Sequence, residues 1–211
     1  MTLTKEMLND IPQLSSYIST RLPAKVMNVE DNQLLNGAGT GVNLQGLMTA
    51  GGGTAFDETS GGKFYEFFGA AASAYTNEFD VLVAAKNQAQ VLEYSPTAIM
   101  VSSSDYNKMF LRKDANANYV VFTNGVLTLL GIPIVVSNAV TEGKFIIGDF
   151  AQGATLAQRE GMEIAFAEQN EANFIKDLVT VKATERIALP IHNPNAFVHG
   201  TFASAIASMN A

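Results

Sequence analysis

Apolar residues recur every three or four positions through the first part of the chain, a spacing typical of a helix with one buried side. The recurring residues are Met7, Leu8, Ile11, Leu14, Ile18, Leu22, Val26 and Val29. They predict a long helix over residues 12–35, with Leu14, Ile18, Leu22, Val26 and Val29 as its buried face. Pro23 has no N–H to bond the Ser19 carbonyl, so we expect the helix to bend there.

Helical and strand patterns follow each other in separate blocks further along the chain. The apolar spacing predicts helices over 63–75, 79–94 and 103–113, and β-branched runs predict strands over 97–102, 129–138 and 144–150. Residues 162–167 and 179–188 alternate with a period of two, which predicts long antiparallel strands with one solvated or partner-facing side. The fold class is therefore α+β, with helix and strand segregated.

A glycine-rich stretch after the long helix, residues 37–41 with the sequence GAGTG, has two readings. A phosphate-binding loop needs a strand before the glycines, but a predicted helix precedes them, and no lysine occurs between Lys25 and Lys63. The stretch therefore favours a helix stop at Asn36-Gly37 and a hinge containing Gly37, Gly39 and Gly41. A second glycine-rich segment, 51–62, predicts a poorly ordered surface loop.

Charged residues make up only 16% of the chain and hydrophobic residues 47%, against roughly 25% charged residues in ordinary soluble domains. This composition favours a surface that is hidden against other chains. The net charge of −7 argues against direct, sequence-specific binding of nucleic acid, which depends on Lys and Arg. No apolar stretch is long enough to span a bilayer, so we expect no membrane partner, and the lack of cysteine excludes disulfides and thiolate metal sites.

Candidate catalytic residues show no spacing that indicates an enzyme, a metal site or a cofactor. His192 and His199 match neither a metal motif nor a catalytic triad, and we expect both to be surface or satisfied structural histidines. The carboxylates considered as acid–base candidates do not form a pair by spacing. They are Asp105, Asp114, Asp149, Glu160 and Glu163.

Several stretches, in order, resemble the major capsid proteins of tailed bacteriophages that share the Hong Kong 97 fold. They are DIPQLSSYISTRL, DNQLLNGAGTGVNLQGL, PTAIMVSSSDYNKMFLRKDANANYV, LLGIPIVVSNAVTEGKFIIGDF and NFIKDLVTVKATERIALPIHNPNAFVHGTF. None is decisive alone, but their order and spacing cover nearly the whole chain.

The resemblance implies a spine helix, a peripheral domain of residues 1–41 and 171–187, and an axial domain of residues 42–170 and 188–211. It implies a structural subunit that assembles with itself or with other capsid subunits into pentamers and hexamers around packaged DNA. The location implied is the virion capsid, and the host bacterial cytoplasm before assembly. Glu185 and Arg186 are candidate inter-subunit contacts, although a solvated strand face is the commoner role for such charges.

Two departures from the family pattern stand out. The N-terminal arm and extended hairpin that family members carry before the spine helix are missing from this sequence. The positions of an isopeptide crosslink found in some relatives correspond here to Asp177 and Thr184, so we expect no self-crosslinking. The shortening leaves two alternatives open: a truncated protein that interferes with or resizes capsid assembly, and an encapsulin-like compartment subunit.

Overall fold

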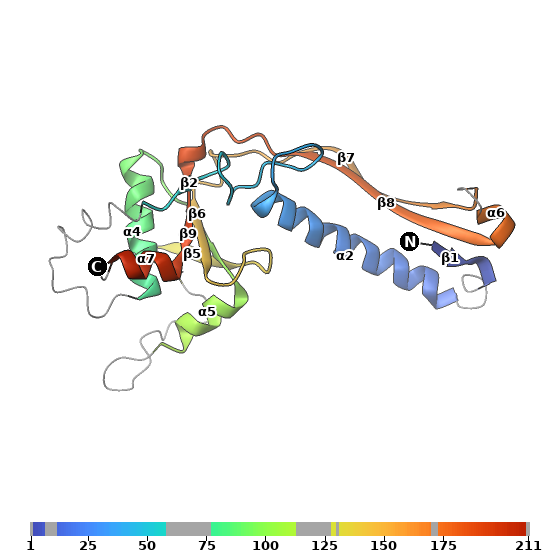
Figure 1. Ribbon diagram of the computed structural model, residues 1–211, viewed down its shortest axis with the longest axis horizontal. Helices are drawn as coiled ribbons and strands as arrows, with labels where there is room; N and C mark the ends of the chain where they lie inside the picture. Colours follow the sequence, from blue (N-terminus) through green and yellow to red (C-terminus); the bar gives the residue numbers. More distant parts are fainter. Residues whose placement is uncertain are drawn as a thin grey trace. The chain divides into compact units, whose positions relative to one another are not determined.

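The chain folds into two compact units in a computed structural model, which describes residues 2–6, 12–57, 77–112, 128–129, 131–169 and 173–209. Unit 1 comprises Met1–Asp31 and Leu156–Leu189, and unit 2 comprises Asn32–Thr155 and Pro190–Ala211. Helix α2 (Pro12–Asn36) is drawn as one helix in Figure 1 and contains Pro23. The boundary between the units falls within this helix. The bend at Pro23 stays a prediction.

Unit 1 is built on a three-stranded antiparallel sheet in the order β1-β8-β7. Its strands are β1 (Thr2–Thr4), β7 (Ala157–Ala167) and β8 (Leu178–Ala188), and the short helix α6 (Asn173–Lys176) lies between β7 and β8. Burial on β8 alternates as the sequence predicts: Val179 and Val181 are buried and Lys182 is exposed. The two long predicted strands are confirmed, and β7 begins earlier than its apolar alternation indicates.

Among the described side chains that α2 contributes to unit 1, Ile18 is buried, while Leu22 and Val26 are half-buried. The prediction that Val29 belongs to the buried face is wrong, because its side chain is 61% exposed. Four buried or half-buried positions are spaced by four residues: Ile18, Leu22, Val26 and Glu30. Each step of four residues turns the covered side by about 40° around the helix axis, so at the level of Glu30 the covered side no longer includes Val29. The side chain of Leu14 lies outside the described residues.

Unit 2 contains a mixed six-stranded sheet in the order β2-β9-β6-β3-β5-β4. The strands are β2 (Thr54–Ala55), β3 (Ala98–Val101), β4 (Thr128–Leu129), β5 (Ile132–Val136), β6 (Lys144–Gly148) and β9 (Phe197–Thr201). The pairs β3–β5 and β2–β9 are parallel, and the other pairs are antiparallel. The single strand predicted over 129–138 is two strands, because Gly131 turns the chain with a φ of +82°.

Among its described residues, unit 2 also contains a 3₁₀ turn (Pro194–Ala196) and the helices α4 (Glu78–Val91), α5 (Ser103–Phe110) and α7 (Phe202–Met209). A capping box starts α4, where the side chains of Asn77 and Asp80 each bond the other's backbone N–H. The core lies between these helices and the sheet. Its fully buried members include Val81, Leu82, Ala85, Ile99, Met109, Phe145, Ile147 and Val198.

The predicted glycine hinge lies inside unit 2 as a hydrogen-bonded turn. The amide of Gly39 donates to the Leu44 carbonyl over 2.9 Å, and that of Gly46 donates to the Gly37 carbonyl over 2.9 Å. Gly39 and Gly41 have φ of +67° and +64°, which favour glycine. Gly37 is not left-handed; its Cβ would meet the Leu44 carbonyl oxygen at 2.3 Å, so close packing requires glycine there. The role of these glycines as a hinge stays a prediction.

Two further expectations about segments differ from the structure. Residues 51–57 are not a loose loop, because they include β2, which pairs in parallel with β9. Residues 58–62 and the helix predicted over 63–75 lie outside the described residues. The boundaries expected for the domains put residues 157–167 with the axial part, whereas β7 pairs with β8 over most of its length and lies in unit 1.

Candidate functional site

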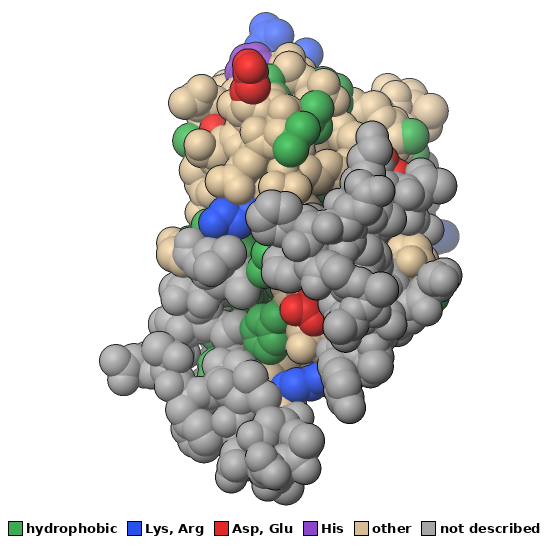
Figure 2. Space-filling view, turned by 90° about the vertical axis from the view of Figure 1, so that its left-hand side faces the viewer, with side chains coloured by type: hydrophobic (Ala, Val, Ile, Leu, Met, Phe, Trp, Pro, Cys, Tyr) green, Lys and Arg blue, Asp and Glu red, His purple; other side chains and the backbone are tan. Residues whose placement is uncertain are grey.

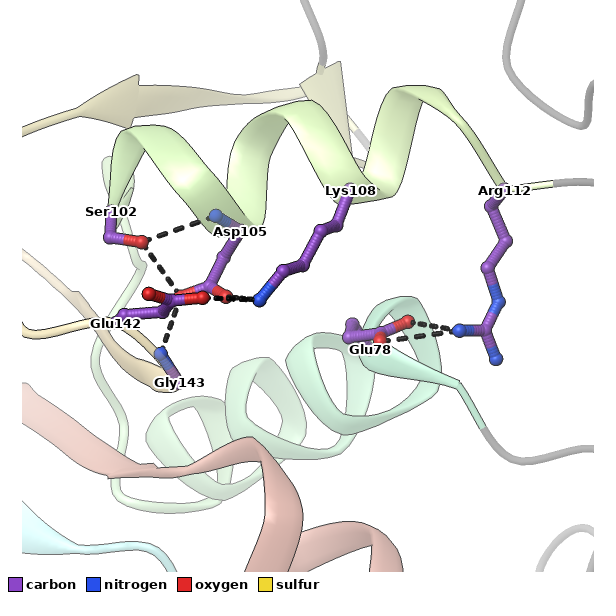
Figure 3. A network of polar contacts seen from close by, with 7 residues as sticks. All are labelled: Glu78, Ser102, Asp105, Lys108, Arg112, Glu142 and Gly143. Carbon is purple, nitrogen blue, oxygen red and sulfur yellow. Dashed lines mark hydrogen bonds and ion pairs between the residues drawn. The ribbon is translucent and has the colours of Figure 1, made fainter.

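A network of polar contacts joins the start of α5 to the turn between β5 and β6 (Figure 3). Ser102 caps α5: its hydroxyl accepts the Asp105 amide at 3.1 Å and donates to Asp105 Oδ2 at 2.8 Å. The amide of Gly143 donates to the same Oδ2 at 2.6 Å. Asp105 is only 6% exposed, so this carboxylate is a buried joint between α5 and the turn.

Ion pairs surround this joint and also hold the other end of α5 (Figure 3). Lys108 Nζ lies 3.5 Å from Asp105 Oδ1 and also binds Glu142. That hydrogen bond lowers the pKa of Glu142 and raises the pKa of Lys108. At the end of α5, Arg112 Nη1 lies 3.0 Å from Glu78 Oε2 at the start of α4.

The contacts of this cluster indicate a structural role rather than a catalytic one. Both oxygens of Asp105 have partners in Ser102, Gly143 and Lys108, so neither is left to act as a base. Asp149 is also buried, and its Oδ1 accepts the amides of Ala151 and Gln152, which closes a turn. Among the described residues, no group of three His, Asp or Glu side chains could hold a metal ion.

The two histidines have different surroundings. His192 is exposed, and its Nε2 lies 2.9 Å from the Thr155 hydroxyl. His199 on β9 is half-buried, and the expectation that it would be satisfied is wrong for its Nε2, which is buried and has no hydrogen-bond partner among the described residues. Burial of the ring lowers the pKa of His199, with a smaller contribution from Lys144, while a hydrogen bond with the backbone of Gly53 opposes the shift.

The charged residues expected at subunit contacts have partners within unit 1. Glu185 Oε1 accepts a hydrogen bond from Gln158 Nε2 at 2.8 Å, and Arg186 lies 3.6 Å from Glu160 across the strand pair. Burial, with the nearby carboxylates of Glu185 and Asp31, raises the pKa of Glu30 on α2. These contacts are typical of a solvated strand face, and a contact with another subunit stays a prediction for Glu185 and Arg186.

Large apolar side chains are exposed on both units. The most exposed are Val42, Ile175, Phe174, Val91, Leu111, Val29, Tyr17 and Met27, each more than half exposed. On the face drawn in Figure 2, the few acidic and basic side chains of the described residues are scattered among uncharged ones. None of the described helices is both long and apolar enough to cross a membrane.

Comparison with known proteins identifies relatives over almost the whole chain. Residues 1–202 match the model of the phage capsid family. The chain is 30% identical, over 206 residues, to the major capsid protein of Enterobacteria phage HK97, a match that covers 95% of this chain and 50% of the relative. The chain thus spans about half the length of this curated relative.

Solved structures share the fold at lower sequence identity. A structure from Gordonia phage Cozz superposes with a TM-score of 0.72 at 12% identity, covering 95% of this chain and 67% of that one. The capsid of the empty GTA particle superposes with a TM-score of 0.67 at 17% identity, covering 96% and 71%. The mixed helix-and-sheet architecture is therefore the Hong Kong 97-like capsid fold, as the resemblance implies. The chain belongs to the phage capsid family.

Proposed function

We propose that this chain is a structural subunit of a phage or prophage capsid. In this proposal, copies assemble into pentamers and hexamers of an icosahedral shell around packaged DNA, and the chain has no enzymatic role. The family match over residues 1–202 carries the proposal, and the named relative is itself a major capsid protein. These names favour a shell subunit over a protein that interferes with assembly or an encapsulin-like compartment.

The surfaces of both units support this function. Large apolar side chains are exposed on both units, and a subunit can bury such side chains against its neighbours. The low charged fraction of 16% has the same explanation. We assign unit 1 to the peripheral domain of the family and unit 2 to the axial domain, with α2 as the spine helix.

The net charge of the chain disfavours tight or sequence-specific binding of the packaged DNA. With a net charge of −7, the chain lacks the excess of Lys and Arg that drives binding to phosphates, so the wall encloses DNA without reading its sequence. The same charge keeps the inner surface from holding DNA tightly. We place the assembled protein in the virion capsid, and the free subunit in the bacterial cytoplasm before assembly.

Particle size in solution tests the proposal directly. We expect the purified chain, as its concentration is raised, to form rings or shells that light scattering and electron microscopy detect. A chain that remains monomeric at every concentration, both alone and when mixed with a full-length capsid protein of the family, would contradict the proposal. A mixture in which this chain lowers the yield of normal shells would instead support the interfering role.

A further inference from the structure

The strand at the β2 edge of the six-stranded sheet is short and is held from both sides. Residues 54–57, the edge segment, contain β2 and the two residues that follow it. On one side, the segment pairs with β9 at two positions, and the Phe56 amide donates to the His199 carbonyl at 2.7 Å. Among the described residues, no other strand lies beyond β2 at this edge of the sheet. The attachment of the segment to the sheet therefore depends on β9.

On the other side, one side chain of α4 binds the backbone of the edge segment. Gln88 Nε2 donates to the Ala55 carbonyl at 3.1 Å, and Gln88 Oε1 accepts the Asp57 amide at 3.1 Å. The carboxamide thus makes the pair of hydrogen bonds that the backbone of a neighbouring strand would make. Phe56, between them, is buried and lies edge-on to Phe145, with ring centroids 6.0 Å apart. The segment therefore has specific contacts with both β9 and α4.

The ring of His199 lies next to the residue that leads into the edge segment. A Cβ on Gly53 would meet His199 Cδ2 at 3.1 Å and the Leu47 carbonyl oxygen at 2.6 Å, so Gly53 is packed between the ring and the backbone of Leu47. His199 Nε2, which is bonded to Cδ2, is buried and has no hydrogen-bond partner among the described residues. In the charged ring this nitrogen carries a proton, and that proton would have no acceptor there. The folded arrangement therefore disfavours the charged ring.

The charged groups on the neighbouring strands do not compensate for this. Lys144 on β6 lies two positions from the residue that pairs with His199, so it is on the same face of the sheet and repels a second cation. Asp57 lies two positions beyond the β2 residue that pairs with His199, but it is exposed, so water screens its attraction. Residues 44–50, on the far side of Gly53, include no charged residue. Burial, with a smaller contribution from Lys144, lowers the pKa of His199, and a hydrogen bond with the backbone of Gly53 offsets only part of the shift.

We propose that the edge segment is a latch, which protonation of His199 releases from β9. The charged ring needs a partner for Nε2, and water reaches this nitrogen when Gly53 and the segment after it move away. The pairing with β9 covers two positions, so the segment can separate while the pairs among β9, β6 and β3 remain. The latch lies within one chain, so it goes beyond the proposed function and does not depend on assembly.

Acid is the direction in which the latch opens. The pKa of His199 is lowered while the segment is attached, and it returns toward the ordinary value of 6.5 when the segment separates. The released state therefore binds more protons below about pH 7, and its population rises as the pH falls. We expect this population to rise about threefold or more between pH 7.5 and pH 5.5.

Hydrogen exchange of the unassembled chain measures the release. We expect the protection factors of the Phe56 and Asp57 amides to fall by the same factor between these pH values. Dilute urea should not accelerate this exchange, because a local opening exposes little surface. His199→Gln should abolish the fall, and His192→Gln, which changes the exposed histidine, should keep it. An equal fall in all three proteins, or exchange of both amides only through urea-sensitive unfolding, would overturn the proposal.

Two further measurements do not depend on the folding of a histidine variant. In the unmodified chain, the NMR signals of the His199 ring and the Phe56 amide should change with one midpoint, and separate midpoints would contradict the latch. Gln88→Leu should lower the protection of the Asp57 amide at both pH values, whereas Gln90→Leu, at an exposed glutamine of the same helix, should not. Unchanged protection in Gln88→Leu would also contradict the latch, since α4 would then not hold the segment. None of these results bears on whether copies assemble.

Discussion

At the scale of single residues, His199 is the group whose surroundings most clearly oppose its charged form. Its ring is half-buried on β9, and its Nε2 has no hydrogen-bond partner among the residues that the structure describes, so burial disfavours the protonated ring more than the neutral one. The nearby Lys144 adds a repulsion. The sequence could not reveal this, because a lone histidine in a strand has the same pattern whether its ring is covered or not.

We expect the stability of unit 2 to fall in mild acid because of His199. The pKa of folded His199 is lowered, while the unfolded chain takes up this proton near pH 6.5. Below about pH 7 the unfolded state therefore binds more protons, and the free energy of unfolding decreases until the folded pKa is passed. Urea unfolding at pH 7.5 and 5.5 measures the difference, which should shrink in His199→Gln and persist in His192→Gln. Equal differences in all three proteins would show that carboxylates alone account for it.

At the scale of elements, α5 is fastened at both ends by polar contacts as well as by its buried Met109. The buried carboxylate of Asp105 joins its first turn to Gly143, which has a φ of +80° in the turn before β6. The sequence pattern predicted the helix and its strand neighbours. The hydrogen bond that links them joins Asp105 to Gly143, 38 positions away, and no local sequence pattern predicts a contact over that separation.

Asp105→Ala should loosen the link between α5 and this turn. The change leaves the half-buried Gly143 amide without its acceptor and removes a partner of Ser102, so we expect a loss of about 1–3 kcal/mol in the free energy of unfolding. Hydrogen exchange should show the Gly143 amide losing protection. Glu142→Gln, which changes an exposed partner of Lys108, is the control and should leave that protection unchanged. Unchanged exchange in Asp105→Ala would mean that the joint does not hold the turn.

The glycine segment after α2 shows a second property of elements that packing decides. Besides its own turn, it is bonded to the end of the helix, where the Leu47 and Met48 amides donate to the Leu34 and Leu35 carbonyls. A Cβ on Gly46 would meet the Gly37 nitrogen at 2.4 Å. Glycine is needed there because two backbone segments are in contact. The sequence does not show this contact, and the same glycines are equally compatible with a hinge.

At the scale of the whole molecule, both units contain buried apolar side chains. In unit 1, Ile18, Val179 and Val181 are buried, and in unit 2 the core joins α4 and the sheet. Unit 1 is assembled from two segments that residues 32–155 separate in sequence. We therefore expect truncation of a buried side chain in one unit to destabilise mainly that unit.

Ile18→Ala should destabilise unit 1 by about 2–5 kcal/mol, the usual cost of truncating a buried isoleucine. Val29→Ala is the matched control on the same helix and should change stability by no more than about 0.5 kcal/mol, because Val29 is 61% exposed. Hydrogen exchange distinguishes the units: amides of β8 should lose protection in Ile18→Ala, and amides of α4 should not. Equal losses in both units would show that they unfold together.

The amino-acid sequence alone determined the helix over residues 12–36, the α4 and α5 helices, most strands and the α+β class, because apolar periodicity and turn residues are local properties. It also carried the family resemblance that the comparisons confirm. Only the tertiary structure decided that β7 joins β8 in unit 1, that Val29 faces water, that β1 and β2 pair at all, and that Asp105 is a buried joint. Each of these depends on contacts between segments distant in sequence, and such contacts are fixed by which surfaces meet rather than by the pattern within any one segment.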